Sequence, residues 1–309
     1  MKLQLVRVLN GLLSCQTIAL LTAALMGGAT SRVFASGGHS DALLVNVGGQ
    51  AVVGTASDID GPEEEFQLDA GVFEAILRAG FTPPPRADYE GDEPGFFGLH
   101  AVNDAGDLAA LGASALPTAA AVSGSLTPFT VNGNVDSLFY WDGAGSVNFQ
   151  PISLAQPNVS FAFKPAAFGA TGGNGDLDDH PIYQINNPSG TPADGVYLVA
   201  PQISVAGLTT SKPFHMAFLV DALIEDEDDL ELVEAALEDF EEGAPNALVD
   251  FGGGVTKDFA FYEESVEWIE SNLVVPEPGT LALAVIGIAA AIAARRRQMS
   301  APGSARGSV

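Results

Sequence analysis

Two glycine-bearing loops rich in carboxylates offer the clearest chemistry in this chain. Their acidic residues are Asp58, Asp60 and Glu63 in the first loop and Asp176, Asp178 and Asp179 in the second. Closely spaced carboxylate oxygens are the ligands that calcium prefers. Neither loop completes an EF-hand, because Asp179 and Ile185 stand where the second loop would need its glycine and its bidentate glutamate. Both loops are candidate calcium sites, but solvated acidic loops without a bound ion are the favoured interpretation.

An aromatic segment in the middle of the chain offers a different chemistry. Tyr140 and Trp141 precede the turn residues 142–145, and Phe149 follows them. Exposed aromatic rings can form a platform on which a sugar stacks, whereas buried rings form core. The segment therefore predicts either a carbohydrate-binding platform at Tyr140 and Trp141 or the apolar side of a hairpin.

The familiar catalytic patterns do not occur in the sequence. Gly-x-Ser-x-Gly, His-Glu-x-x-His and a glycine-rich loop ending in Gly-Lys-Ser/Thr are all absent, and the four histidines lie far apart along the chain. A glycosidase needs only two carboxylates at the right separation, which an acidic sequence neither supports nor excludes. We therefore expect no enzymatic activity and no cofactor other than calcium, with a polysaccharide-acting hydrolase as the less favoured alternative.

The C-terminal region contains a short motif, an apolar run and a basic cluster in that order. They are Pro276, Glu277 and Pro278, then Leu281–Ala294, then Arg295, Arg296 and Arg297. As a helix the apolar run would cover about 21 Å, less than the ~30 Å hydrocarbon core of a bilayer. The arginines resist translocation and hold the end of the chain in the cytoplasm. We predict a transmembrane helix over residues 275–298 and a disordered cytoplasmic tail over residues 299–309. An ordinary single-pass anchor is the alternative.

The N-terminal region has the composition of a signal peptide. Lys2 and Arg7 precede a largely apolar stretch over residues 8–26, and small residues lead to Ala35. We predict a signal helix within residues 1–35 and cleavage by signal peptidase after Ala35. Cys15 lies in a lipoprotein-like sequence, but the apolar stretch continues well beyond it. Because Cys15 is the only cysteine, the mature body has no disulfide and no cysteine-ligated metal.

The C-terminal order of motif, apolar run and arginines resembles the PEP-CTERM sorting signal of bacteria that produce exopolysaccharide. This module also carries the label of an ice-binding protein C-terminal domain. The resemblance implies processing by an exosortase, a membrane-bound cysteine transpeptidase. It also implies transient anchoring in the inner membrane and a final location at the cell envelope, the outer surface or the extracellular matrix.

The body between these signals is strongly acidic. Residues 36–275 hold 38 of the 39 acidic residues but only five of the 12 basic ones, which gives this region a formal net charge of −33. Such a field repels nucleic acid and anionic membrane surfaces and attracts cations. We therefore expect no nucleic-acid partner, and residues 36–274 are expected to form one acidic extracytoplasmic domain.

Several short apolar runs bounded by glycine and proline predict a mainly β body. The expected strands cover residues 41–47, 50–55, 137–141, 146–149, 159–163, 195–200 and 213–220. Residues 73–77 fit either a strand or a helix, and the resemblance to exported PEP-CTERM proteins described below favours a strand. These runs predict a β-sandwich of jelly-roll type.

Two helices are expected late in the body. Leu230, Val233, Leu237 and Phe240 share one face of a helix that Gly243 ends. Tyr262, Val266, Ile269 and Leu273 repeat the same spacing. In both cases the apolar stripe predicts packing on the core, although the acidic outer face of the first helix is also a possible partner surface.

The order of five short motifs resembles a group of uncharacterised exported PEP-CTERM proteins. The motifs cover residues 92–96, 138–143, 179–180, 192–198 and 211–214. This group has no assigned activity, and its members often have paired histidines where this chain has only His180. That departure weakens the transfer of any histidine metal site.

These observations together favour a non-enzymatic exported protein of the envelope or matrix that associates with exopolysaccharide. A calcium-assisted carbohydrate-binding module is the alternative, and signal peptidase, an exosortase and exopolysaccharide are the expected partners.

Overall fold

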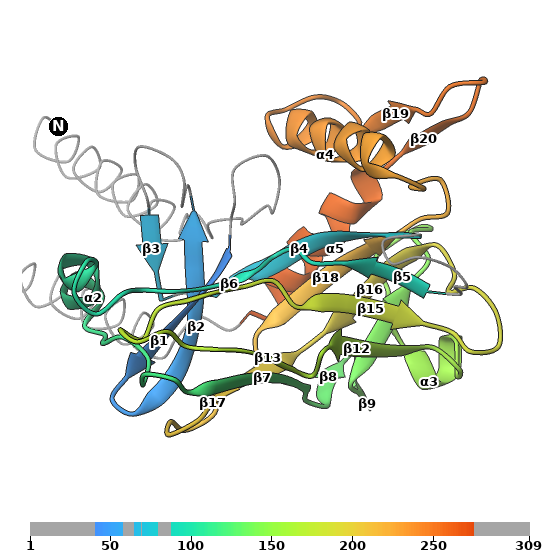
Figure 1. The fold of residues 1–309 in the computed structure, drawn as a ribbon. Helices are drawn as coiled ribbons and strands as arrows, with labels where there is room; N and C mark the ends of the chain where they lie inside the picture. The colour runs from blue at the N-terminus through green and yellow to red at the C-terminus, as the bar shows by residue number, and fades with distance from the viewer. Residues whose placement is uncertain (1–40, 58–64, 69, 80–87, 275–309) are drawn as a thin grey trace, which may run out of the picture. The chain divides into compact units, whose positions relative to one another are not determined.

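The computed structural model describes residues 41–57, 65–68, 70–79 and 88–274, which all belong to one compact unit (Figure 1). Several predicted features lie outside these residues: the signal peptide with Ala35, the sorting segment, the tail, and the loop with Asp58, Asp60 and Glu63. Within the described ranges, no helix combines the length and the apolar character that crossing a membrane requires. The mainly β fold predicted from the sequence is confirmed.

The largest sheet has eight strands. Their order is β11 (Gln150–Pro151), β10 (Leu138–Trp141), β16 (Gly195–Val199), β18 (His215–Val220), β4 (Val72–Ala79), β5 (Asp88–Gly91), β15 (Ile182–Asn186) and β12 (Ser160–Lys164). All neighbours are antiparallel except β4 and β18. All five residues of β16 are buried, because both faces of the sheet are covered there.

A five-stranded sheet contains the first hairpin of the body. Its order is β14 (Leu177–Asp179), β6 (Phe96–Gly98), β1 (Asp41–Val47), β2 (Gln50–Ser57) and β3 (Glu65–Gln67). The hairpin of β1 and β2 turns at Gly48 and Gly49, which both have positive φ, and the Asn46 side chain accepts the Gly49 N–H. Side chains alternate across β1, so that Leu44 and Leu43 lie in different core clusters.

Smaller sheets complete the β structure. Three strands run in the order β13 (Ala167–Ala170), β7 (Ala121–Leu126) and β17 (Pro201–Val205), and two ladders pair β8 (Phe129–Val131) with β9 (Asn134–Asp136) and β19 (Leu248–Asp250) with β20 (Thr256–Asp258). Val122 and Ile203 join Tyr197 and Phe218 of the eight-stranded sheet in the main core. Two sheets therefore share one apolar core, as in a sandwich.

Two helices share a second core with the eight-stranded sheet (Figure 1). α4 (Glu227–Glu241) begins at the N-cap Asp226, and α5 (Ala260–Asn272) follows β20. Val233 and Leu237 of α4 are fully buried, and Tyr262 of α5 hydrogen-bonds to backbone groups of β4 and β18. Both late helices predicted from the sequence are confirmed.

One local prediction needs correction. The expected strand at residues 146–149 is a loop, and β10 pairs instead with the two-residue β11. Phe149 packs against Trp268 in the core rather than continuing a ladder. Two short helices, α2 (Ala105–Leu111) and α3 (Ile152–Ala155), were not predicted.

Candidate functional site

A histidine surrounded by carboxylates lies at the edge of the five-stranded sheet. β6 pairs in parallel with β1 through Phe96 and Ala42, and in antiparallel with β14 through Phe96 and Asp179. Asp41, Gly95 and His180 each lie one residue beyond these pairs. The register of three strands therefore brings together residues that are distant in sequence.

The imidazole of His180 faces three acidic side chains. Its Nδ1 lies 3.3 Å from Glu93 Oε1, and its Nε2 lies 3.5 Å from Asp178 Oδ1 and 3.9 Å from Asp41 Oδ2. The Asp41 side chain is only 4% exposed, whereas that of Asp178 is 77% exposed. The site thus has one buried carboxylate and one side that opens to solvent.

The carboxylates determine the charge of this site. The interaction with Glu93 raises the pKa of His180 to about 9, with further contributions from Asp41 and Asp178, so the imidazole carries a proton at neutral pH. Burial raises the pKa of Asp41, and the charge of His180 opposes this change. Burial also raises the pKa of the nearby Asp92. The protonated imidazole therefore balances part of the negative charge of this cluster.

Backbone contacts hold the loop that carries Glu93. Asp41 Oδ1 accepts the N–H of Gly95 at 2.9 Å, and the Gly95 carbonyl accepts the N–H of Ala42 at 2.9 Å. The buried Tyr183 hydroxyl donates to the carbonyl of Pro94 at 2.5 Å. Position 95 requires glycine, because a Cβ there would lie 2.7 Å from His180 Nε2. The site is therefore held in place before any ligand arrives.

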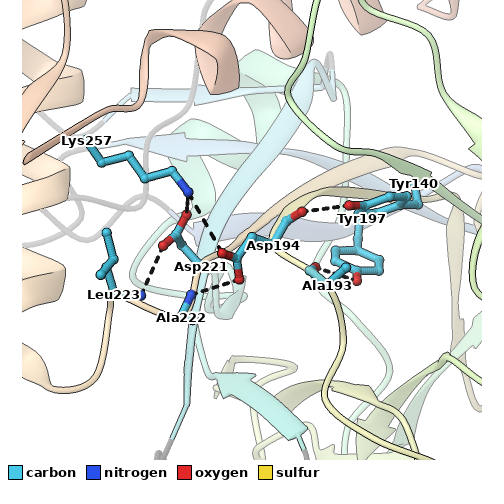
Figure 2. Close-up of polar contacts among 8 residues, drawn as sticks. All are labelled: Tyr140, Ala193, Asp194, Tyr197, Asp221, Ala222, Leu223 and Lys257. Atoms are coloured by element: carbon cyan, nitrogen blue, oxygen red, sulfur yellow. Dashed lines mark hydrogen bonds and ion pairs between the residues drawn. The ribbon is translucent and has the colours of Figure 1, made fainter.

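A second charged cluster joins the end of β18 to β20 and to the loop before β16 (Figure 2). Lys257 contacts the fully buried carboxylate of Asp221 and lies 3.9 Å from Asp194. Asp221 also accepts the N–H of Leu223, and Asp194 accepts the N–H of Ala222, both at 3.0 Å. Every acceptor in this cluster points to a donor of the chain itself, which indicates a structural role.

Two tyrosines fasten the same loop. The Tyr140 hydroxyl donates to the carbonyl of Asp194 at 2.7 Å, and the Tyr197 hydroxyl donates to the carbonyl of Ala193 at 2.8 Å (Figure 2). Burial raises the pKa of Tyr140 to about 12. Both phenols are therefore neutral hydrogen-bond donors at physiological pH.

A third ion pair lies within the eight-stranded sheet. Lys164 of β12 lies 3.1 Å from Glu90 of β5, whose side chain is 1% exposed, and Gln184 between them contacts Glu90 and Asp88. Because the partners lie on three consecutive strands, β5, β15 and β12, this cluster supports the sheet rather than a ligand.

The structure places the predicted aromatic platform mostly inside the protein. Trp141 is 3% exposed and contacts Phe149 and Phe261 in the core beneath α5. A ring buried in this way offers no face to a sugar, so Trp141 as a carbohydrate platform is a wrong prediction. Tyr140 is only partly exposed, and its ring lies against Tyr197.

The three acidic residues of the second predicted calcium loop point to different places. Asp176 accepts the N–H of Asn174 within its own turn, and Asp179 occupies the space beside Gly169. Only Asp178 belongs to the cluster around His180. Because Asp178 and Asp179 are adjacent on β14, their side chains lie on opposite faces, so the structure does not bring all three carboxylates together.

The site at His180 was not predicted as a unit. The segments containing Glu93 and His180 were each noted as motifs, but no local pattern connects them to Asp41. His100 accepts backbone N–H groups in its own turn, and His215 packs against Phe129, so the described histidines do not gather at one site.

The comparisons with known proteins identify one part of the chain. The family model of the PEP-CTERM protein-sorting motif matches residues 274–297. No curated protein and no solved structure matches the chain. The chain therefore carries a PEP-CTERM sorting signal, which marks an exported protein that an exosortase recognises.

Proposed function

We propose that this exported, PEP-CTERM-bearing chain is a non-enzymatic structural or interaction protein of the outer surface or extracellular matrix that associates with exopolysaccharide. The observation that carries the proposal is the sorting motif at residues 274–297, attached to a folded acidic β body. Because this motif directs export and membrane processing, the folded body acts outside the cytoplasm.

The use of charged side chains supports a structural role. Arg78 contacts Glu227 at 2.6 Å, Lys164 contacts Glu90 and Lys257 contacts Asp221. These cations are engaged in internal pairs, so the remaining carboxylates give the surface an excess of negative charge. That surface keeps the body soluble in a crowded matrix.

The environments of the described histidines support the absence of catalysis. His100 is a turn acceptor, His180 lies among carboxylates, and His215 is packed against an aromatic ring. None of these contacts is to a serine hydroxyl, which a histidine base would activate in a hydrolase. The buried position of Trp141 gives no support to the alternative of a carbohydrate-stacking module.

Cell fractionation tests the sorting step. In the producing organism, the wild-type chain should appear shortened in the envelope and exopolysaccharide fractions. A variant with Pro276, Glu277 and Pro278 replaced by alanine should stay full length in the inner membrane. Ser304→Ala, in the predicted tail, is the matched control and should behave as wild type. Retention of the full-length wild-type chain in the inner membrane would contradict the proposal.

Co-sedimentation tests the association with the matrix. The purified protein is mixed with exopolysaccharide from the same organism in calcium and then in chelator. Sedimentation in both buffers supports direct association, and sedimentation in calcium alone supports the calcium-assisted alternative. If the protein stays in the supernatant in both buffers, direct association is refuted, and only the sorting part of the proposal stands.

A further inference from the structure

Three potential ligand atoms from two distant segments converge at the edge of the five-stranded sheet. One carboxylate oxygen of Asp41, one of Asp178 and one ring nitrogen of His180 all lie within 4.8 Å of one another. Asp41 begins β1, whereas Asp178 and His180 lie at the end of β14. All three residues belong to the folded body, so this inference holds whatever the role of the sorting motif at residues 274–297.

The distances between these atoms fit a shared metal ion better than direct hydrogen bonds. His180 Nε2 lies 3.5 Å from Asp178 Oδ1 and 3.9 Å from Asp41 Oδ2, which is longer than a normal hydrogen bond. Two ligands bound at about 2.0–2.1 Å in a tetrahedral zinc site are separated by roughly 3.4 Å. A small contraction would therefore bring all three atoms to a common ion.

A metal-binding histidine also needs a partner that holds its ring in position, and Glu93 is that partner for His180. Its Oε1 lies 3.3 Å from His180 Nδ1, on the opposite side of the ring from Asp41 and Asp178. A carboxylate at one ring nitrogen fixes the orientation of the imidazole and directs the other nitrogen to the metal. Glu93 is held in turn by the loop whose Gly95 N–H binds Asp41 Oδ1.

The burial of Asp41 adds to the case for a metal ion, because the partner of its Oδ2 is the long 3.9 Å contact to His180, which a metal ion between the two side chains would replace. Its side chain is 4% exposed, and Oδ2 points to His180 without reaching hydrogen-bond distance. Buried carboxylates in proteins are paired or coordinate metals. The 77% exposure of Asp178 leaves a path for an ion to enter and for water to complete the coordination shell.

From this geometry we propose that Asp41, Asp178 and His180 bind one divalent transition-metal ion of the zinc class, with Glu93 as the positioning residue for His180. The nitrogen ligand favours zinc over calcium, which prefers six to eight oxygen ligands. The ion joins β1, the loop before β6 and the end of β14, so it fastens an edge strand to the centre of the sheet. It binds by displacing the proton on His180 Nε2.

Metal binding to the purified full-length protein tests this proposal. The protein is stripped with chelator, mixed with zinc at high ionic strength to screen its acidic surface, desalted, and analysed for bound metal and by calorimetry. We expect one tight zinc per chain, and cobalt in its place should give the visible absorption of a low-coordinate site. Calcium at the same concentration should not compete.

Matched variants separate this site from the general acidity of the surface. Asp178→Asn should weaken zinc binding at least tenfold, and Glu93→Gln should weaken it by about 10–100-fold. Asp179→Asn removes a neighbouring carboxylate on the opposite face of the same strand and should bind as wild type. Asp178 is exposed, so its variant should fold, which the circular dichroism spectrum checks. Equal binding by Asp178→Asn and Asp179→Asn, or no zinc retained by the wild type, would overturn the proposal.

Discussion

The hydroxyl of Tyr262 offers a sharp test of how α5 is attached to the eight-stranded sheet. Tyr262 is fully buried, accepts the N–H of Ala75 at 3.0 Å and donates to the carbonyl of Ala217 at 2.8 Å. Tyr262→Phe keeps the ring and removes these contacts. In this variant the Ala75 N–H has lost its acceptor and is buried where water cannot replace it.

The expected loss is about 2 kcal/mol in the free energy of unfolding, because a buried donor without a partner costs about 1–3 kcal/mol. The Ala217 carbonyl loses one donor as well, but a carbonyl oxygen has two lone pairs and contributes less to the loss. In a domain of this size, a loss of 2 kcal/mol lowers the melting temperature by roughly 4–8 °C.

Urea unfolding followed by circular dichroism measures the difference, and Tyr140→Phe is the matched control. The Tyr140 hydroxyl donates to the carbonyl of Asp194 near the surface, where water can replace it. The control should therefore lose only about 0.5 kcal/mol. Equal losses for the two variants would show that the buried hydroxyl of Tyr262 is not what joins α5 to β4 and β18.

Three further predictions concern the second core, the buried ion pair and pH. Leu237→Ala in α4 should cost about 2–5 kcal/mol in urea unfolding because Leu237 is fully buried, whereas Leu232→Ala on the same helix, 48% exposed, should change stability by less than about 0.5 kcal/mol. Lys257→Met should cost about 3–5 kcal/mol because it leaves the buried Asp221 without its cation, and adding Asp221→Asn should recover part of that loss in a double-mutant cycle. Burial lowers the pKa of His215 from 6.5 to about 4, so the unfolded chain binds a proton that the folded chain resists. Stability should therefore fall by up to roughly 3 kcal/mol as pH drops from 6.5 to 4, and His215→Gln should flatten this slope relative to the wild type in unfolding measured at pH 7 and 4.5.

The sequence predicted the elements that are determined by neighbouring residues, such as the first hairpin and α4. The hairpin of β1 and β2 follows from two glycines and the side chain of Asn46, all within four residues. The stripe on α4 follows from helical spacing, and its N-terminus from Asp226, which accepts the Asp229 N–H. Each of these features needs no information from the rest of the chain.

The segment after Trp141 was misread because tertiary contacts override its hairpin pattern. Asp142 accepts the N–H of Ala144, and the Trp141 indole donates to the carbonyl of Ala144, so the chain forms a compact loop. Gly143 has positive φ and lies against Phe261 of α5. The loop is therefore shaped by a helix more than a hundred residues later, which no local pattern reveals.

The candidate site depends even more strongly on distant parts of the chain. Asp41 meets His180 only because β6 lies between β1 and β14 in one particular register, with a parallel pair on one side. The motifs at residues 92–96 and 179–180 marked two of its segments, but Asp41 reads as the first residue of an ordinary apolar strand. A shift of one residue in either pairing would move one carboxylate to the other face of the sheet.

The distribution of charge on α4 connects the fold to the proposed place of action. The acidic residues of its first turn suit the positive end of the helix dipole, but its last turn has no basic residue and ends among further acids. Buried Val233 and Leu237 and the contact between Arg78 and Glu227 must therefore hold the helix against repulsion. Cations of the medium reduce that repulsion over a Debye length of about 10 Å at 0.1 M salt. The same surface repels any anionic polymer unless cations lie between the two, so it gives the body no attraction of its own for such a polymer. The sorting motif at residues 274–297, and not this surface, is therefore the feature that marks the protein for export.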